Sequence, residues 1–231
     1  MASMRDIKRR RASIQSTEQI TKAMKLVSTV KLQKSKARAE ESADYFNQMY
    51  DTICSILRRS GSIEHKYLKA GNSQKKAVIA VTSNRGLAGG YNNNIIRLIA
   101  GSKELPAQDT YVYAIGRKGR DGLARKGYTI KADYSEVINE PMYRDAADIT
   151  AELLELFTQG EIGEIYLAYT FFKNTVTHIP KLVKLLPVET DLSGEASGNE
   201  NLLMNYEPNE DEVLNAIVPK YMSSLIYGGL L

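Results

Sequence analysis

Apolar and polar side chains follow a helical period over the first sixty residues. Residues 1–60 contain no glycine and no proline, and strong helix formers fill most of this segment. Small and apolar residues recur there at seven-residue spacing: Ile7, Ile14, Thr21 and Ser28, with Met24, Val27 and Val30 close to the same face. This spacing is typical of a helix that packs along another helix. Such a helix, at about 1.5 Å per residue, would be roughly 80 Å long, so we expect it to project beyond a domain of this size.

The second half of this predicted helix has a wider apolar face. Its apolar residues step by three or four positions: Ala39, Ala43, Phe46, Tyr50, Ile53 and Leu57. A face of this width is suited to lying on a globular body. Gly61 is expected to end the helix, because glycine is the residue most often found just past a helix end.

Strand and helix patterns alternate through the middle of the chain. The expected strands are 77–83, 110–116 and 128–134, and the expected helices are 91–100 and 143–160, with a short basic helix or a turn over 117–127. This order predicts an α/β fold in which helices cover a mostly parallel sheet. Two further apolar segments, 164–172 and 177–187, are separated by only four residues. They are expected to form an antiparallel hairpin at the edge of the sheet.

The last part of the chain is predicted to hold a polar loop and one helix. Acidic and small residues fill 191–208, which reads as an acidic loop. A helix follows from about Glu210 to Tyr227 within the segment 209–231, with Asn209 or Asp211 as its N-cap. Gly228 and Gly229 are expected to break that helix.

Charge is distributed unevenly along the chain. Residues 1–59 carry thirteen Lys or Arg against six Asp or Glu, whereas residues 189–231 carry eight Asp or Glu against Lys220 alone. This asymmetry predicts that the two ends face different partners. The longest apolar stretches are far shorter than the roughly 18 residues of a membrane span, and the first twenty residues do not resemble a signal segment. We therefore expect no direct membrane insertion and a protein of the cytosol or of a membrane surface.

The segment SNRGLAGGYNNN, residues 83–94, lies where many α/β proteins hold a phosphate, between a strand and a helix. A Walker-type loop needs a lysine and a hydroxyl directly after its last glycine, but a tyrosine and an asparagine follow Gly90. The glycine spacing also differs from the dinucleotide fingerprint. We favour a structural βα turn in which glycine permits positive φ angles and close packing, formed by Arg85, Gly86, Gly89 and Gly90. A nucleotide-binding α/β enzyme that uses the Gly86–Gly90 loop is the alternative.

Other patterns give little sign of catalysis, metal binding or a cofactor. His65 and His178 are far apart and have no nearby ligands at metal-site spacing. The lone Cys54 cannot form an internal disulfide and is expected to be a packed thiol. Four carboxylates step along the helix 143–160 as a solvated face does: Asp145, Asp148, Glu152 and Glu155. The basic N-terminal segment lacks interleaved aromatic residues, so nucleic-acid binding is a weaker alternative.

Two segments carry a resemblance to a known family. The segment IKRRRASIQSTEQITKAMKLVSTVKLQKSK (7–36), followed by TSNRGLAGGYNNN (82–94), closely resembles the gamma subunit of the F-type ATP synthase. The most specific parts are I-x-x-T-x-x-I-T-K-A-M-x-x-V-S, from Ile14 to Ser28, and the glycine loop. YEP at 206–208 and the IYGGLL ending also look like the family.

The resemblance implies a central-stalk rotor subunit without an active site or cofactor of its own. Its expected parts are a shaft helix over 1–60, which is half of an antiparallel coiled coil, and a Rossmann-like domain over 75–190 at the foot. The expected partners are the alpha and beta subunits of the hexamer, the epsilon subunit and the membrane c ring. Proton- or sodium-driven rotation of that ring would be coupled to ATP synthesis or hydrolysis, at the cytoplasmic face of a bacterial plasma membrane.

The resemblance also implies positions for two contact sites. Lys22, Met24 and Lys25 are expected to contact the acidic loops of the beta subunits, and Tyr206 and Glu207 to contact the ring. Gamma subunits continue with a long C-terminal helix that pairs with the N-terminal one. The sequence stops at 231, before this helix begins, so we expect a fragment of the subunit's sequence or a shortened form of it, in preference to a naturally short rotor.

Overall fold

The computed structural model describes residues 3–59, 65–188 and 209–231. The chain divides into two compact units, Met1–Ala43 together with Leu231, and Asp44–Leu230. Tyr206, Glu207 and the acidic loop 191–208 lie outside the described residues, as does Gly61.

The predicted long N-terminal helix is present as α1 (Met4–Arg59). Every side chain from Ser3 to Lys34 is exposed, including the apolar residues at seven-residue spacing. Farther along the helix, Met49, Ile53 and Cys54 are buried. The expected contact of the second half of α1 with a globular core is therefore confirmed at Ile53, which belongs to the largest hydrophobic cluster.

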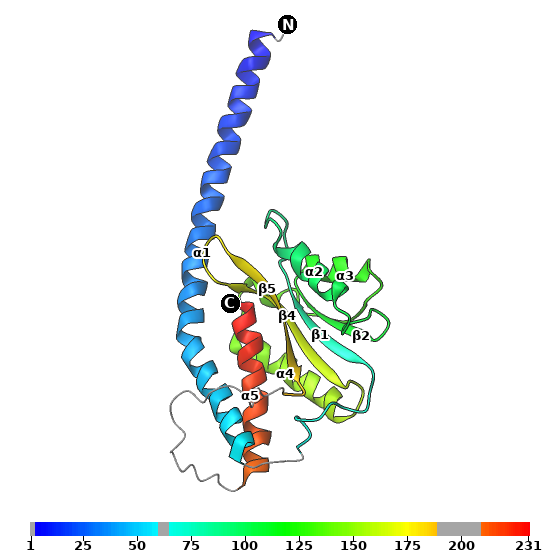
Figure 1. The fold of residues 1–231 in the computed structure, drawn as a ribbon. Coiled ribbons are helices and arrows are strands. Elements are labelled where there is room, and N and C mark those ends of the chain that lie inside the picture. Colours follow the sequence, from blue (N-terminus) through cyan, green and yellow to red (C-terminus); the bar gives the residue numbers. More distant parts are fainter. Residues whose placement is uncertain (1–2, 60–64, 189–208) are drawn as a thin grey trace. The chain divides into compact units, whose positions relative to one another are not determined.

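A five-stranded sheet forms the centre of the Asp44–Leu230 unit (Figure 1). Its strands are β1 (Lys76–Val81), β2 (Thr110–Ile115), β3 (Thr129–Asp133), β4 (Glu164–Phe172) and β5 (His178–Leu186). They lie in the order β3-β2-β1-β4-β5. Neighbouring strands are parallel except for β4 and β5, which form the predicted antiparallel edge hairpin. The predicted α/β fold with a mostly parallel sheet is confirmed.

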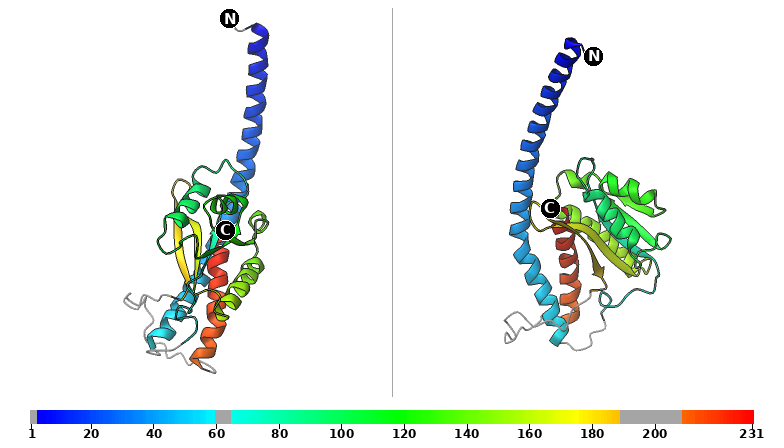
Figure 2. Two further views of the ribbon diagram at one scale, coloured as in Figure 1. Left: turned by 90° about the vertical axis from the view of Figure 1, so that its right-hand side faces the viewer. Right: turned by 45° about the horizontal axis from the view of Figure 1, so that its top comes forward.

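Helices cover both faces of this sheet (Figures 1 and 2). They are α2 (Tyr91–Gly101), α3 (Arg117–Ala124), α4 (Tyr143–Thr158) and α5 (Glu210–Leu230), with a short 3₁₀ turn η1 (Val137–Asn139) before α4. Strand β1 alternates between two cores, because successive side chains of a strand point to opposite faces. Val78 and Ala80 pack with α2 and α3, and Ile79 and Val81 pack with α4 and α5. The sheet is thus the middle of three layers.

Helix α5 begins as predicted but ends later. The Oδ1 of Asn209 accepts a hydrogen bond from the backbone N–H of Glu212 at 2.9 Å, which identifies Asn209 as the N-cap. The expected break at Gly228 and Gly229 is wrong, because the helix continues to Leu230. A Cβ at Gly229 would lie 3.4 Å from the Cβ of Tyr169, so glycine fits this turn closely against β4. Burial of Leu230 then offsets the low helix propensity of the two glycines.

We predict that the same substitution will have different effects at two positions of α1. Ile53→Ala should lower the free energy of unfolding of the Asp44–Leu230 unit by about 2–5 kcal/mol, because Ile53 is 0% exposed. Ile14→Ala should change the free energy of unfolding by about 0.5 kcal/mol or less, because Ile14 is 67% exposed. Urea unfolding of both variants would test this, and equal effects would contradict the described packing.

Candidate functional site

Three parallel strands of the sheet end in polar residues or glycine at one edge. Thr82, Ser83 and Asn84 follow β1, Gly116 follows β2, and Asp133 ends β3. The carboxyl ends of parallel strands meet at the same edge, and open α/β sheets bind ligands in the crevice outside it. This edge is therefore the place where a nucleotide would have to bind.

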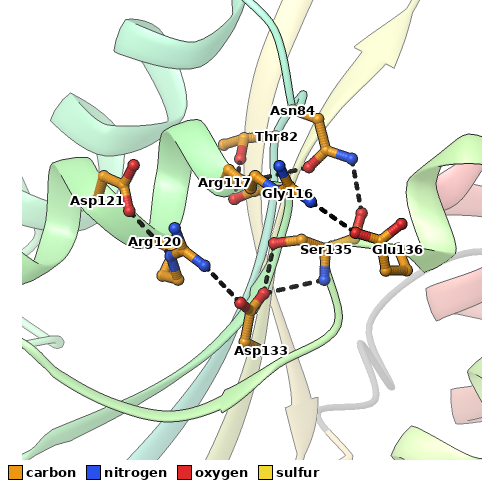
Figure 3. Close-up of polar contacts among 9 residues, drawn as sticks. All are labelled: Thr82, Asn84, Gly116, Arg117, Arg120, Asp121, Asp133, Ser135 and Glu136. Atoms are coloured by element: carbon orange, nitrogen blue, oxygen red, sulfur yellow. Dashed lines mark hydrogen bonds and ion pairs between the residues drawn. The ribbon is translucent and has the colours of Figure 1, made fainter.

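The N-terminus of α3 is occupied by side chains and backbone of this edge (Figure 3). Its first three backbone N–H groups donate hydrogen bonds to the residues that follow β1: Arg117 to Asn84 Oδ1 (3.0 Å), Lys118 to the Ser83 carbonyl (3.1 Å) and Gly119 to Thr82 Oγ1 (2.8 Å). In phosphate-binding folds, such N-terminal N–H groups bind the anion. In this chain the same groups are already satisfied within the protein.

Glycines bring α3 close enough to β1 for these bonds. Gly116 has a φ of 104°, and a Cβ there would lie 2.1 Å from the carbonyl oxygen of Thr82. A Cβ at Gly119 would lie 2.6 Å from Thr82 Oγ1. Gly122 is similarly close to α2, since its Cβ would be 2.4 Å from the Cδ1 of Ile96. Side chains at these positions would push α3 away from the edge.

Ion pairs and hydrogen bonds fix the other side of α3. Arg120 donates to Asp133 and to Asp121, at 2.6 Å and 2.9 Å, and Arg117 donates to Glu136 at 2.7 Å (Figure 3). Burial alone would raise the pKa of Asp133, but hydrogen bonds from Ser135 and Arg120 outweigh it and hold that pKa below its ordinary value. The carboxylate of Asp133 therefore stays ionised at neutral pH and keeps its bond to α3.

Asn84 joins this network to the segment after β3. Its Oδ1 accepts from the Arg117 N–H, and its Nδ2 donates to the Ser135 carbonyl at 2.8 Å (Figure 3). Both polar atoms of the amide are thus used within the domain. The edges of β1, β2 and β3 are held together by the chain's own groups.

The predicted βα turn lies between β1 and α2. Asn92 ties it down, because its Oδ1 accepts from the Ser83 N–H at 2.8 Å. The Ser83 hydroxyl donates to the Arg85 carbonyl at 2.6 Å. Gly89 has a positive φ of 57°, as expected of a glycine in this turn, but Gly86 and Gly90 do not.

The turn also contains a feature that the glycine pattern does not predict. Leu87 has a φ of 63° and is 96% exposed. Positive φ is uncommon for a residue other than glycine. The close strand-to-helix packing that was expected of the turn glycines is found instead at Gly116, Gly119 and Gly122, because a Cβ at Gly86 would meet nothing within 4 Å.

The residues predicted to contact the beta subunits lie on the exposed part of α1. Lys22 Nζ pairs with Glu18 Oε1 at 2.7 Å, one helical turn away. Met24 is 52% exposed, and Lys25 is also exposed. Lys22 and Lys25 line a hollow on this helix. Its other lining residues are Ser13, Ile14, Thr17, Glu18 and Thr21. This surface offers positive charge and small side chains.

The carboxylates of α4 have separate structural partners. Asp145 accepts from the Met142 N–H at 2.9 Å as part of a capping box, and Glu155 accepts from Gln159 at 3.0 Å. Glu152 accepts from the Tyr134 hydroxyl. Across residues 3–59, 65–188 and 209–231, no three His, Cys, Asp or Glu side chains gather as metal ligands would. Among the helices in those ranges, none has the length and apolar character that crossing a bilayer requires.

The network around α3 could have been found only in part from the sequence. A signal was present, since polar residues or glycine follow each of the first three strands, and such positions converge at one edge. The segment RKGRDGLARKG, however, looks like a weak helix because it contains glycines. Gly119 packs against Thr82 and Gly122 against Ile96, both more than twenty residues earlier in the chain, so local patterns do not reveal the role of these glycines.

We predict that glycine substitutions separate the closed edge from the exposed turn. Gly116→Ala should lower the free energy of unfolding by about 3 kcal/mol or more, because it combines a steric overlap with a disfavoured φ. The control Gly86→Ala should change it by about 0.5 kcal/mol or less, because there is open space around that position. Thermal and urea unfolding would measure both changes. A tolerated Gly116→Ala would show that α3 does not need its close approach to β1.

Comparison with solved structures gives the same architecture. The chain aligns with a chain of the Tetrahymena thermophila mitochondrial ATP synthase, in a structure of the central stalk and c ring, with a TM-score of 0.61 and 21% identity. The alignment covers 91% of each chain. At this level of identity the similarity establishes the fold.

Comparison of sequences identifies the family. Residues 3–231 match the sequence model of a family described as ATP synthase. The ATP synthase gamma chain of Lachnoclostridium phytofermentans is 61% identical over 237 residues, which cover 100% of this chain and 81% of the relative. The sodium ion specific ATP synthase gamma chain of Acetobacterium woodii is 34% identical over 245 residues, which cover 99% of this chain and 81% of the relative. The chain therefore belongs to the ATP synthase gamma chain family.

Proposed function

We propose that this chain is the central-stalk rotor subunit of an F-type ATP synthase. It couples rotation of a membrane ring, driven by a proton or sodium gradient, to ATP synthesis or hydrolysis in a hexamer of alpha and beta subunits. The observation that carries this proposal is the 61% identity to a gamma chain along the whole of this chain. The exposed N-terminal part of α1 agrees with a role in contacts between subunits.

The beta-facing contacts are assigned to Lys22, Met24 and Lys25. A shaft that turns inside a ring of subunits needs contacts that form and break easily, and exposed ionic contacts are worth only about 0–1 kcal/mol each. The side chains from Ser3 to Lys34 are exposed and mostly small or charged, which suits such contacts. Positive charge opposite acidic loops would guide each contact without locking it.

The ring-facing contacts are assigned to Tyr206 and Glu207, near the middle of the acidic C-terminal segment. The Rossmann-like domain (75–190) is the foot of the stalk and contacts the epsilon subunit and the c ring. This arrangement makes the chain a peripheral subunit at the cytoplasmic face of a bacterial plasma membrane.

The chain carries no active site of its own, and its effect on catalysis is conformational. An asymmetric rotor makes different contacts with three beta subunits, and these differential contacts shift each beta subunit between states of different nucleotide affinity. The network of Thr82 and Asn84 at the edge of the sheet supports this non-catalytic role, since it uses the N–H groups that would otherwise bind a phosphate. The nucleotide-binding enzyme built on Gly86–Gly90 has no comparable support.

The test is assembly and rotation with the subunits of a relative. The chain would be co-expressed with the alpha, beta and epsilon subunits of the Lachnoclostridium phytofermentans synthase, both as it is and extended with the final segment of that relative's gamma chain. A probe can be attached at Lys103→Cys, because Lys103 is exposed and the natural Cys54 is buried. We expect a complex in which the probe rotates during ATP hydrolysis. Failure of both forms to assemble would contradict the proposed function.

The contact assignment is tested in the same assay by Lys22→Gln, Met24→Ala and Lys25→Gln combined. Loss of these contacts should lower the rate of coupled hydrolysis by about two- to tenfold, as expected for a few weak ionic contacts. The control combines Lys131→Gln and Lys173→Gln, which remove two exposed positive charges from β3 and from the β4–β5 turn. An equal loss in the control would mean that total charge, and not this face of α1, sets the rate.

A further inference from the structure

The helical layers on the two faces of the sheet carry opposite charges. Residues 85–127, which include α2 and α3, contain eight Lys or Arg against three Asp or Glu. On the other face of the sheet, α4 contains four Asp or Glu against Arg144 alone, and α5 contains three against Lys220 alone. A charge separation of this kind orients a protein in the field of its neighbours.

The positive charge of this layer is concentrated in α3 and the three residues that follow it. These eleven residues, 117–127, include five Lys or Arg and one Asp. Arg117 and Arg120 are paired with acidic residues of the same domain. Lys118, Arg125 and Lys126 are exposed, and no carboxylate among the described residues pairs with them. Arg125 donates one side-chain N–H to the carbonyl of Asp121 at 3.1 Å, and the other N–H groups of its guanidinium can bind another partner.

The helix that presents these charges is held firmly. Its first turn is bonded to the end of β1, and its apolar residue Leu123 is buried against α2. Gly119 packs closely against Thr82, and Gly122 packs closely against Ile96. A rigid element presents charged side chains with less loss of entropy on binding than a mobile loop does.

We propose that an exposed surface at α3, formed by Lys118 in the helix and by Arg125 and Lys126 directly after its end, is a docking surface for a carboxylate-rich segment of a neighbouring subunit. It is called the α3 surface below. The inference rests on the proposed function, because that function supplies the assembly in which the neighbour is found. The residues of this surface differ from those assigned to the contacts with the beta subunits and with the ring. Its contacts would be charge-assisted hydrogen bonds between guanidinium or ammonium groups and carboxylates.

Two observations favour an acidic protein over an anionic membrane. The apolar side of α3 is turned inward, since Leu123 is 0% exposed, so the helix has no apolar face to insert between lipids. The arginines of this helix already bind carboxylates of the domain, with N–O distances of 2.6–2.9 Å, so the surface has the geometry for that chemistry.

A second copy of this chain is a poorer occupant. The acidic layer that would have to meet α3 consists of α4 and α5, and all four carboxylates of α4 are engaged locally: Asp145 with Met142, Asp148 with Arg144, Glu152 with Tyr134 and Glu155 with Gln159. Those carboxylates would have to break existing contacts to pair with α3, and that cost reduces the gain from a new ion pair.

Zero-length crosslinking of the assembled complex tests the surface. A carbodiimide would be applied to the complex with the Lachnoclostridium phytofermentans subunits, because it joins a lysine amine to a carboxylate only when the two are in contact. Mass spectrometry should find Lys118 or Lys126 joined to an Asp or Glu of another subunit. Because exposed ion pairs are screened by salt, the yield should fall by about fivefold or more when the salt is raised to about 1 M.

A variant that reverses the charge of Arg125 but keeps Lys118 and Lys126 tests whether this surface attracts carboxylates. Arg125→Glu should lower the yield at Lys118 and Lys126 by about fivefold or more, since it repels a carboxylate-rich partner. Lys173→Glu changes the net charge equally, on the exposed β4–β5 turn, and should leave the yield unchanged. Arg125→Gln, which is milder at the end of α3, should give an intermediate yield. Thermal unfolding of each variant shows whether α3 stays folded.

Four results would contradict the proposal that the α3 surface is a docking surface for an acidic segment. In an intact complex, crosslinks from Lys118 and Lys126 only to carboxylates of their own chain would do so, as would a yield that Arg125→Glu does not change. Crosslinks between two copies of the chain alone, or protection of both lysines by vesicles with about a third anionic lipid but not by the other subunits, would also do so. Failure of any complex to form would contradict the proposed function and this surface together, whereas an intact complex without these crosslinks contradicts the surface alone.

Discussion

The close contact between Thr82 and the first turn of α3 determines which backbone N–H groups at the carboxyl edge of this sheet remain free to bind a ligand. In an open α/β sheet, free N–H groups at helix N-termini make that edge an anion site. Here Thr82, Ser83 and Asn84 accept hydrogen bonds from the first three N–H groups of α3, and Gly116 allows the approach. None of these three N–H groups is left free to bind an anion at the N-terminus of α3.

The contacts of α3 with the edge of the sheet also limit which surfaces of the domain can bind other molecules. Both faces of the sheet are covered by packed helices, and ion pairs from Arg117 and Arg120 tie α3 to the end of β3 and to the segment after it. The chemistry that remains available is on the outside, as charge on α3 and as charge and small side chains on the exposed part of α1. A protein built in this way acts through contacts with other subunits, in agreement with its place in the gamma chain family.

The sequence predicted those features that depend on local patterns. The absence of glycine and proline before Gly61 predicted the long helix α1, and the four-residue gap between apolar segments predicted the β4–β5 hairpin. Asn209 was one of the two residues predicted as the N-cap of α5, and the structure selects it. Predictions failed where a contact with a residue distant in the sequence determines the local structure. Gly228 and Gly229 read as a helix break, but packing of Gly229 against Tyr169 and burial of Leu230 extend α5 through them.

The candidate site shows the same division. The missing lysine after Gly90 was enough to argue against a Walker loop, because that chemistry depends on a local motif. The closure by α3 depends on Thr82 meeting Gly116 and Gly119 from another part of the chain, and no local pattern shows such a meeting. The positions of Tyr206 and Glu207 lie outside the described residues and stay predictions.

The central claim is that the edge after β1, β2 and β3 is closed to nucleotides. Isothermal titration of the purified chain with magnesium ATP tests it most directly, at nucleotide concentrations up to about 1 mM, where even weak specific sites give measurable heat. The account predicts no saturable binding. Binding of one ATP per chain that is lost in Arg85→Ala, a residue of the βα turn, would contradict it and would favour the nucleotide-binding alternative.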